Sequence, residues 1–476
     1  MPSALAWSNA STSTVAATPW HPMAGVVMPR VASGYRAGLR SSTNAAASAD
    51  FVTDISYTEY GSAACTLGVA ADNTVFVAPA FTVDGVGVLR SSDFGKSWRA
   101  SVPEGVQQSR NRPYLYFDDV DERLFLHAGR FDAVPPHPLR TGFTLGVSDD
   151  RGETWRTRKV ASKARMDAKV FAGPSNSRSG RVTYLSAPTP FAVRVRPLIN
   201  VTRQVIWRSF DGGVKWEVAG GFDIDSKNIP GLPSREYVAF GKGVVAPDGT
   251  VYIGGRYGRR FAVAVSRDEG LTWDVRMVPG SALAKYHNAV HFLLLGSRYL
   301  LPESMAVDDD GNVYAVWPDR DGLLHAAWSS DGAVTWSRPV VVSAPGVRDA
   351  RFGAITATGS GRVGIAYYGR ERGRAFHGFI AQCRDFRTSG PVFVGGKYNE
   401  PDAPLFPYGF CSVVPGFGSR RSLNEIVRVH FAPNGDLVTG AAMQMRGRNR
   451  QRPWAARSEH TEMQAVLGRL GRIVSA

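Results

Sequence analysis

Seven stretches of the chain share one pattern of polar and hydrophobic positions: a short polar turn, then a strand of apolar or alternating residues. Such alternation, or a short apolar run bounded by turn residues, is typical of β-strands buried on one or both faces. We therefore predict an all-β protein built from a repeated unit. The copies are Asn73-Thr-Val-Phe-Val, Glu122-Arg-Leu-Phe-Leu, Gly180-Arg-Val-Thr-Tyr, Gly249-Thr-Val-Tyr-Ile, Gly311-Asn-Val-Tyr-Ala, Gly361-Arg-Val-Gly-Ile and Gly435-Asp-Leu-Val-Thr.

A second pattern, Ser-x-Asp-x-Gly-x-x-Trp, follows five of these strands at intervals of about 60 residues, which is a repeat period. The glycine supplies positive φ, and the Ser and Asp oxygens accept bonds from turn amides, so we expect structural turns rather than catalytic aspartates. We expect the tryptophan to be buried at an equivalent position in each unit. The copies run Ser91–Trp98, Ser148–Trp155, Ser209–Trp216, Ser266–Trp273 and Ser329–Trp336, the last with Ala333 in place of glycine.

Each unit offers about four strands, the signature of a β-propeller blade. Eroded copies of the second pattern at Cys383–Gly390 and Ser458–Ala465 favour seven four-stranded blades, with six blades and a C-terminal extension as the alternative. We expect residues 1–50, rich in Ser, Thr and Ala, to be an N-terminal arm, and residues 51–476 to be one propeller domain. The predicted blades are 51–102, 113–160, 167–220, 236–280, 288–344, 350–396 and 424–470.

The Ser-x-Asp-x-Gly-x-x-Trp turns resemble the Asp-box, or bacterial neuraminidase repeat, of the sialidase-like propellers. The resemblance implies that these turns lie on the outer rim of the propeller, away from a central site. Because one fold carries many functions, it does not by itself imply an activity.

Sialidases hold their substrate carboxylate with three arginines and use a tyrosine nucleophile activated by a glutamate, with an aspartate as acid/base. By resemblance Glu236 is the partner of the nucleophile and Arg256 is one clamp arginine, with Arg259 and Arg260 following on the next turn. Arg320, in Trp317-Pro-Asp-Arg320, lies where relatives place another clamp arginine.

Two positions depart from the sialidase pattern. The stretch Tyr60–Leu67 contains no arginine for the first clamp position, and Phe352 stands where the nucleophilic tyrosine is expected. Asp84 is only loosely placed to be the acid/base. Loss of a clamp residue and of the nucleophile removes most transition-state stabilisation, so we favour a non-catalytic protein over a sialidase-like glycoside hydrolase.

The chain carries a formal net charge of +15, mostly as arginine. Arg256, Arg259, Arg260 and Arg320 belong to the fourth and fifth predicted blades, where first strands converge on a central funnel. Clustered guanidinium groups favour carboxylate, sulfate or phosphate, so we expect any small ligand to be anionic and to bind there. Nothing resembles a nucleic-acid-binding module.

No metal site or cofactor is predicted. His287 and His291 lack the glutamate of a metalloprotease motif, and Asp308–Asp310 precedes a strand, as a plain turn does. The three cysteines (Cys65, Cys383 and Cys411) indicate no disulfide framework, and no stretch is apolar enough for a membrane span.

Two functions remain open. The first is an interaction or assembly subunit, with protein partners or self-assembly through residues 1–50. The second is a glycan-directed protein, either an exo-glycosidase of sialidase type or a lectin-like binder of anionic sugars. The N-terminus shows no cleavable secretion signal, which leaves the compartment open between an extracellular and a particle-associated surface.

Overall fold

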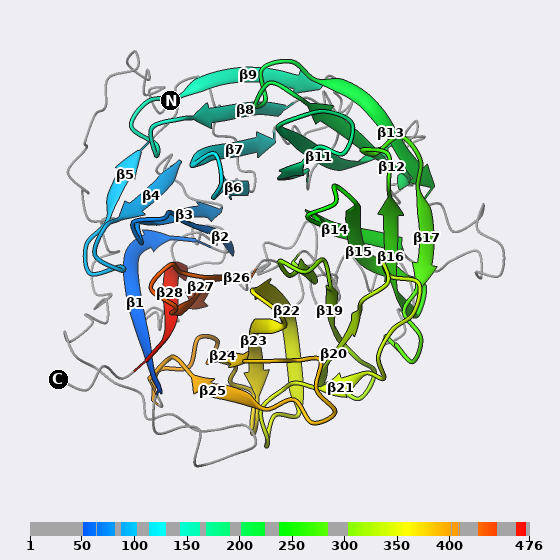
Figure 1. Cartoon of the computed structure of the whole chain (residues 1–476). Coiled ribbons are helices and arrows are strands. Elements are labelled where there is room, and N and C mark those ends of the chain that lie inside the picture. Colours follow the sequence, from blue (N-terminus) through cyan, green and yellow to red (C-terminus); the bar gives the residue numbers. More distant parts are fainter. Residues whose placement is uncertain are drawn as a thin grey trace, which may run out of the picture.

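The computed structural model describes residues 51–62, 64–80, 87–101, 114–129, 143–161, 168–190, 201–223, 238–283, 303–400, 402–407, 409, 427–444 and 463–472. These residues form 28 strands, which pair into seven four-stranded antiparallel sheets. The sheets stand around a common centre as the blades of a β-propeller (Figure 1). The prediction of seven blades is thus confirmed. None of the described segments is a helix that could span a membrane.

The first three blades run from Ala64 to Asp223. Their strands are β2 (Ala64–Val69), β3 (Val75–Ala80), β4 (Val88–Ser91) and β5 (Arg99–Ser101); β6 (Tyr114–Asp118), β7 (Arg123–Gly129), β8 (Phe143–Ser148) and β9 (Arg156–Ala161); and β10 (Lys169–Pro174), β11 (Arg181–Pro190), β12 (Val201–Ser209) and β13 (Glu217–Asp223).

The remaining blades continue to the C-terminus, and the seventh also takes in the first strand of the chain. Their strands are β14 (Val238–Val245), β15 (Val251–Tyr257), β16 (Arg260–Ser266) and β17 (Asp274–Met277); β18 (Met305–Val307), β19 (Val313–Pro318), β20 (Leu324–Ser329) and β21 (Val340–Val341); β22 (Asp349–Thr358), β23 (Arg362–Arg370), β24 (His377–Cys383) and β25 (Phe393–Lys397); and β26 (Arg428–Phe431), β27 (Leu437–Gln444), β28 (Met463–Arg472) and β1 (Phe51–Gly61).

The first strand of each blade in blades one to six is innermost and the fourth is outermost, in sequence order (Figure 1). Because neighbouring strands are antiparallel, the turn between second and third strands lies at the end of the ring where the first strand begins. The connection to the next blade lies at that end too. We name this end the inlet face. The opposite end, the turn face, carries the first-to-second and third-to-fourth strand turns.

The ring is closed by the two ends of the chain. Strand β1 pairs with β28 in the seventh blade, from Phe51 opposite Arg472 to Tyr57 opposite Val466. The prediction of a separate seventh blade near the end of the chain is confirmed, because β26 and β27 pair only within that sheet. Assigning residues 51–61 to the first blade was wrong. The seventh blade takes its outermost strand, β1, from the beginning of the chain and its other three strands from the end. This pairing of the two chain ends closes the ring.

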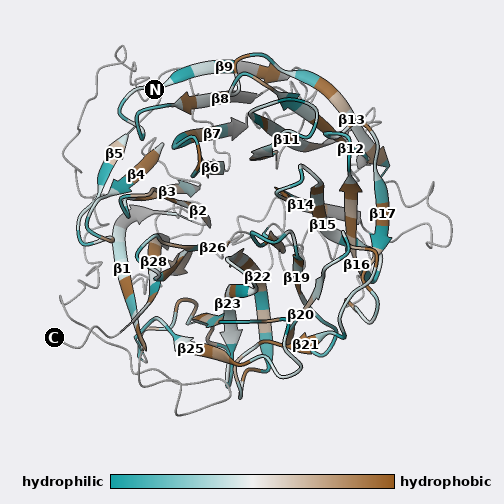
Figure 2. Ribbon diagram, in the orientation of Figure 1, coloured by the Kyte–Doolittle hydropathy of each residue, from teal (hydrophilic) through white to brown (hydrophobic). Residues whose placement is uncertain are grey.

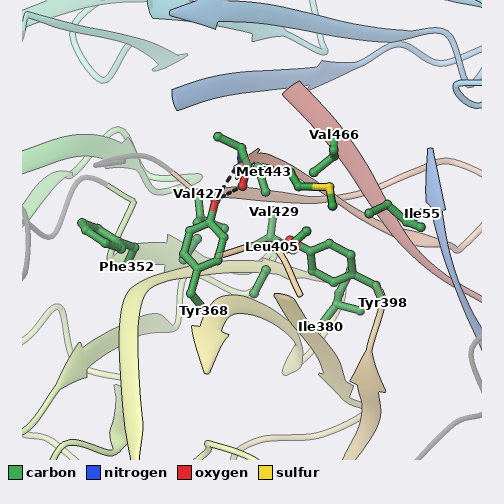
Figure 3. Close-up of a cluster of buried hydrophobic side chains, with 14 of the residues drawn as sticks. Ile55, Phe352, Tyr368, Ile380, Tyr398, Leu405, Val427, Val429, Met443 and Val466 are labelled. Carbon is green, nitrogen blue, oxygen red and sulfur yellow. Dashed lines mark hydrogen bonds between the residues drawn. The ribbon is translucent and has the colours of Figure 1, made fainter. Parts of the chain in front are cut away.

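The closing strand contacts both neighbouring blades. The Thr53 hydroxyl donates to the carbonyl of Lys397 in the sixth blade at 2.7 Å, and the Ser56 hydroxyl donates to Gly95 in the first. Figure 3 shows the apolar core between the sixth and seventh blades, in which Tyr368 reaches the backbone of β27. The amide of Ala442 donates to the Tyr368 hydroxyl at 3.0 Å.

The five Ser-x-Asp turns have one geometry. In the third blade the Ser209 hydroxyl donates to Asp211 at 2.8 Å and accepts from the amide of Gly213 at 2.9 Å, while the amide of Lys215 donates to Asp211 at 2.9 Å. Ala333 keeps the left-handed conformation of the glycine that it replaces, with φ of 65°. All five turns join the third strand to the outermost one, at the rim of the turn face.

The tryptophans of these turns occupy equivalent positions, but they are half-buried rather than buried. Each ring packs against a hydrophobic core cluster, and the indole N–H of Trp216 and of Trp273 donates to the carbonyl of its turn glycine at 2.9 Å. The expectation of full burial was wrong because the residue lies just before the outermost strand, beyond which no further strand covers the ring.

Adjacent blades interlock through glycines on their inner strands. A Cβ atom on Gly243 would lie 2.3 Å from the Phe171 ring, and one on Gly173 would lie 2.3 Å from Val245. These two glycines let the third and fourth blades approach closely. Figure 2 shows that hydrophilic residues gather at the turns, while hydrophobic residues recur along strands such as β16, the third strand of the fourth blade.

Candidate functional site

Five polar side chains from five different blades meet at the centre of the ring, and we name them the axial cluster. Its members are Tyr114 (β6), Lys169 (β10), Lys242 (β14), Glu303 (directly before Ser304 and β18) and Arg428 (β26). The second, fifth and seventh blades are not neighbours, so contacts among their innermost strands are made across the propeller axis. A bulge between Phe240 and Gly243 interrupts the regular register of β14 at Lys242.

Glu303 is the hub of the axial cluster. The Tyr114 hydroxyl donates to its Oε1 at 2.7 Å, while Oε2 lies 3.5 Å from Arg428 Nε and 3.7 Å from Lys242 Nζ. The Arg428 guanidinium also donates to the carbonyls of Leu67 at 2.9 Å and Leu115 at 2.5 Å. These bonds tie the first, second, fifth and seventh blades together at the axis.

The axial cluster is rich in positive charge. It holds three cations, Lys169, Lys242 and Arg428, against the single carboxylate of Glu303. Burial, with a smaller contribution from the nearby Arg428, lowers the pKa of Lys242 to about 8, against the opposing effects of Glu303 and Asp119. Burial raises the pKa of Tyr114 well above its ordinary value, so its phenol stays protonated at neutral pH.

The sequence-predicted arginines lie outward from this cluster. Arg256 is buried near the end of β15, opposite Ala239 on one side and Phe261 on the other. Arg259, on the turn between β15 and β16, and Arg260, the first residue of β16, are exposed. Arg320 is exposed at the turn between β19 and β20. Arg256 thus differs from the other three predicted arginines in being buried.

The two arginine-bearing turns of the fourth and fifth blades are held side by side by one connecting segment. The amide of Leu283 donates to the carbonyl of Arg259 at 2.9 Å, and the amide of Arg320 donates to the carbonyl of Ala282 at 2.8 Å. Asp319 accepts bonds from the Ala282 amide at 2.9 Å and from the Trp317 indole at 3.0 Å. Among the described residues, no ion pair involves Arg259, Arg260 or Arg320.

Glu236 and Asp84 lie outside the described residues, as do Cys411 and the pair His287 and His291. Phe352 is buried, adopts a left-handed conformation with φ of 54° at a bulge in β22, and packs edge-on against Tyr368. It supplies no phenol at the position where the resemblance places a nucleophile.

The structure gives no sign of a metal site in the regions that it describes, where no group of three His, Cys, Asp or Glu side chains gathers. Asp308 accepts bonds from the amide of Asn312 at 2.8 Å, from the Tyr314 hydroxyl at 2.7 Å and from the amide of Gly361 at 3.0 Å. Its oxygens therefore serve a turn that ties the fifth blade to the sixth. Cys65 and Cys383 are buried free thiols.

Sequence reasoning missed the axial cluster. Its only local signal is a charged residue beside a short apolar first strand, as at Lys169 before Val-Phe and Arg428 before Val-His-Phe. A charged residue in that place is equally typical of a solvent-exposed strand end. The contacts of the axial cluster therefore cannot be predicted from the sequence, since they form between blades once the ring is closed.

Comparison with known proteins finds likeness in structure alone: no protein-family model and no curated protein matches the sequence. The intramolecular trans-sialidase from Ruminococcus gnavus in complex with oseltamivir carboxylate is similar at 12% identity over 81% of this chain and 90% of that chain, with a TM-score of 0.38. The Aleuria aurantia lectin in complex with Fucα1-6GlcNAc is similar at 12% identity, over 73% and 97%, with a TM-score of 0.40. A protein of unknown function from Dyadobacter fermentans is similar at 12% identity, over 92% and 100%, with a TM-score of 0.42.

Proposed function

We propose that this chain is a non-catalytic propeller of the Asp-box type that works by binding, as an interaction or assembly subunit. Its ligand carries a carboxylate, sulfate or phosphate, as an acidic sugar does. The observation that carries the proposal is the set of three exposed arginines, Arg259, Arg260 and Arg320, on adjoining turns of the inlet face with no ion pair among the described residues. Guanidinium groups bind such anions through paired hydrogen bonds, and within the described residues the only hydrogen bond of these three groups is a 3.3 Å bond from Arg260 to the carbonyl of Ser281.

Burial of Arg256 changes its role in this proposal. Its guanidinium sits within the fourth blade, so we propose that it supports the positive potential of the inlet face without itself contacting the ligand. The axial cluster adds to that potential from the centre of the ring, because its cations outnumber its carboxylate.

A hydrolase is the second candidate, and one contact favours it. The Tyr114 phenol donates to the Glu303 carboxylate at 2.7 Å beside Arg428, the residue types of a sialidase nucleophile and its partner. Three features oppose it: the phenol pKa is raised, both side chains are more than 90% buried, and the Arg428 guanidinium is occupied by backbone carbonyls. We therefore prefer the binding role, with Tyr114 and Glu303 as structural residues.

Calorimetric titration with glucuronate, galactose 6-sulfate and neutral galactose tests the binding role. We expect the acidic sugars to bind and galactose not to bind. The double variant Arg259→Ser with Arg320→Ser should lose most of the affinity. The matched double variant Arg99→Ser with Arg158→Ser, which removes the same charge from exposed positions on outer strands β5 and β9, should retain it. Equal loss in both variants would contradict the proposed site.

The absence of catalysis is tested with an aryl sialoside, whose activated leaving group needs little acid assistance. We expect no turnover. Turnover that disappears in Tyr114→Phe would establish the hydrolase instead. Turnover that disappears in Glu236→Gln would identify Glu236 as the partner of its nucleophile.

A further inference from the structure

The exposed arginines of the fourth and fifth blades belong to a longer row on the inlet face. Arg348 lies on the connection between the fifth and sixth blades, and Arg372 and Arg374 lie on the turn between β23 and β24. All three are exposed, and none makes an ion pair within the described part of the chain. Together with Arg259, Arg260 and Arg320 they form what we name the arginine arc.

Backbone hydrogen bonds show that the arc is continuous over three blades. The fourth- and fifth-blade turns share the segment of Ala282 and Leu283, as described above. The amide of Ala350 then donates to the carbonyl of Gly322 at 2.7 Å, and the amide of Arg348 donates to the carbonyl of Arg370 at 2.8 Å. Each arginine-bearing turn is therefore bonded to the next segment of the arc.

The acids on these turns and connections already have partners. Asp321 pairs with His325 at 2.8 Å, Asp349 pairs with Arg351 at 2.5 Å and with Arg370 at 3.2 Å, and Glu371 pairs with Lys397 at 2.6 Å. Asp319 accepts the bonds to Ala282 and Trp317. The six arginines of the arc thus face solvent and, among the described residues, form no ion pair with the acids of their own turns.

We propose that the arginine arc binds an acidic polysaccharide chain, with successive sulfate or carboxylate groups on successive arginines. The inference rests on the proposed function for the three arginines of the fourth and fifth blades, and it extends the site to a polymer. A continuous row of cations over three blades matches a linear polyanion better than a single acidic sugar, which can contact only one part of it.

The chemistry of the surface selects among polyanions. None of the exposed large hydrophobic side chains in the described regions is aromatic, and none lies on the arc. Stacking of unpaired nucleic-acid bases uses exposed aromatic rings, and insertion into a membrane interface uses exposed apolar ones. A polysaccharide with regularly spaced anionic groups needs only the guanidinium row.

The test uses the full chain and heparin, a sulfated polysaccharide, with binding measured against salt concentration. The triple variant Arg348→Ser, Arg372→Ser and Arg374→Ser removes half of the arc and spares the arginines of the proposed small-ligand site. The control triple variant Arg99→Ser, Arg158→Ser and Arg384→Ser removes the same charge from exposed positions outside the arc that likewise make no ion pair within the described regions.

We expect the arc variant to bind heparin at least about tenfold more weakly. The slope of log affinity against log salt should fall in magnitude by about two, because binding releases fewer counterions from heparin when three arginines are missing. In the control variant, the changes in heparin affinity and in salt slope should each be less than half of those in the arc variant. Equal losses in both triple variants would overturn the proposal, as would tighter binding of a DNA duplex of matched charge, or of phosphatidylserine vesicles, than of heparin.

The outcome also separates this inference from the proposed function. If glucuronate binds through Arg259 and Arg320 but the arc variant binds heparin with unchanged affinity, the polysaccharide inference alone is wrong. If heparin binding depends on the arc while no small acidic sugar binds, the proposed small-ligand site is wrong and the arc stands.

Discussion

Lys242 offers the most direct check on the electrostatics of the axial cluster. Its side chain keeps only 17% exposure, and its nearest counter-charge is a Glu303 oxygen at 3.7 Å, which Arg428 shares. Replacing it by methionine preserves most of the length of the side chain and removes the charge. We predict that Lys242→Met stabilises the protein at neutral pH.

The magnitude follows from the pKa of Lys242, which falls from 10.5 to about 8 on folding, chiefly through burial. Each pKa unit is about 1.4 kcal/mol, so charged Lys242 costs the folded state about 3 kcal/mol at pH 7. Because the folded pKa lies below the unfolded one, the unfolded chain binds more protons between pH 8 and 10.5. The free energy of unfolding therefore rises with pH across that window. Below pH 8 the folded state bears the full cost of burying the charged lysine.

The assay is urea unfolding followed by the fluorescence of the 11 tryptophans, for wild type and Lys242→Met at pH 7 and pH 10. We expect Lys242→Met to be more stable by up to about 3 kcal/mol at pH 7, with most of the advantage gone at pH 10. The difference between the two proteins removes contributions from other groups that titrate in this range. Lys96→Met, at an exposed turn position, is the control and should differ little from wild type at either pH.

Two results would refute this reasoning. A destabilised Lys242→Met at pH 7 would mean that the lysine is a net favourable partner of Glu303. An advantage of the same size at pH 7 and pH 10 would mean that the gain comes from packing and not from removal of a buried charge.

Three further changes probe the fold. Gly243→Ala should destabilise by about 1–3 kcal/mol in urea unfolding, because its Cβ would lie 2.3 Å from the Phe171 ring, whereas Gly390→Ala, with open space around it, should not. Asp211→Asn should cost about 1–2 kcal/mol by weakening the turn bonds, yet leave calorimetric binding of acidic sugars unchanged. Removing Phe51–Gly61 leaves β28 paired with β27 alone and without its outer partner, so we expect loss of the cooperative unfolding transition. A transition like that of the full chain would show that closure by β1 is dispensable.

The candidate site could be predicted only in part. Three of the predicted arginines, Arg259, Arg260 and Arg320, lie exposed on adjoining turns because each belongs to a short turn whose blade position the repeats already indicate. Arg256 was predicted beside them but is buried. Whether a side chain near the end of a strand is buried depends on how closely the neighbouring blade packs against it. The sequence of a single strand does not reveal that distance.

By itself, the sequence determined the all-β class, the sevenfold repeat and the position of each Ser-x-Asp turn, because these depend on neighbours a few residues apart. The bond from Gly213 to Ser209, for example, spans four positions. Only the tertiary structure decided that Phe51–Gly61 completes the last blade and that Tyr114, Glu303 and Arg428 meet at the axis. The bond from Tyr114 to Glu303 spans 189 positions, and that from Arg428 to Leu67 spans 361. Contacts of such span exist only once the ring has closed and brought the innermost strands of all blades to one axis.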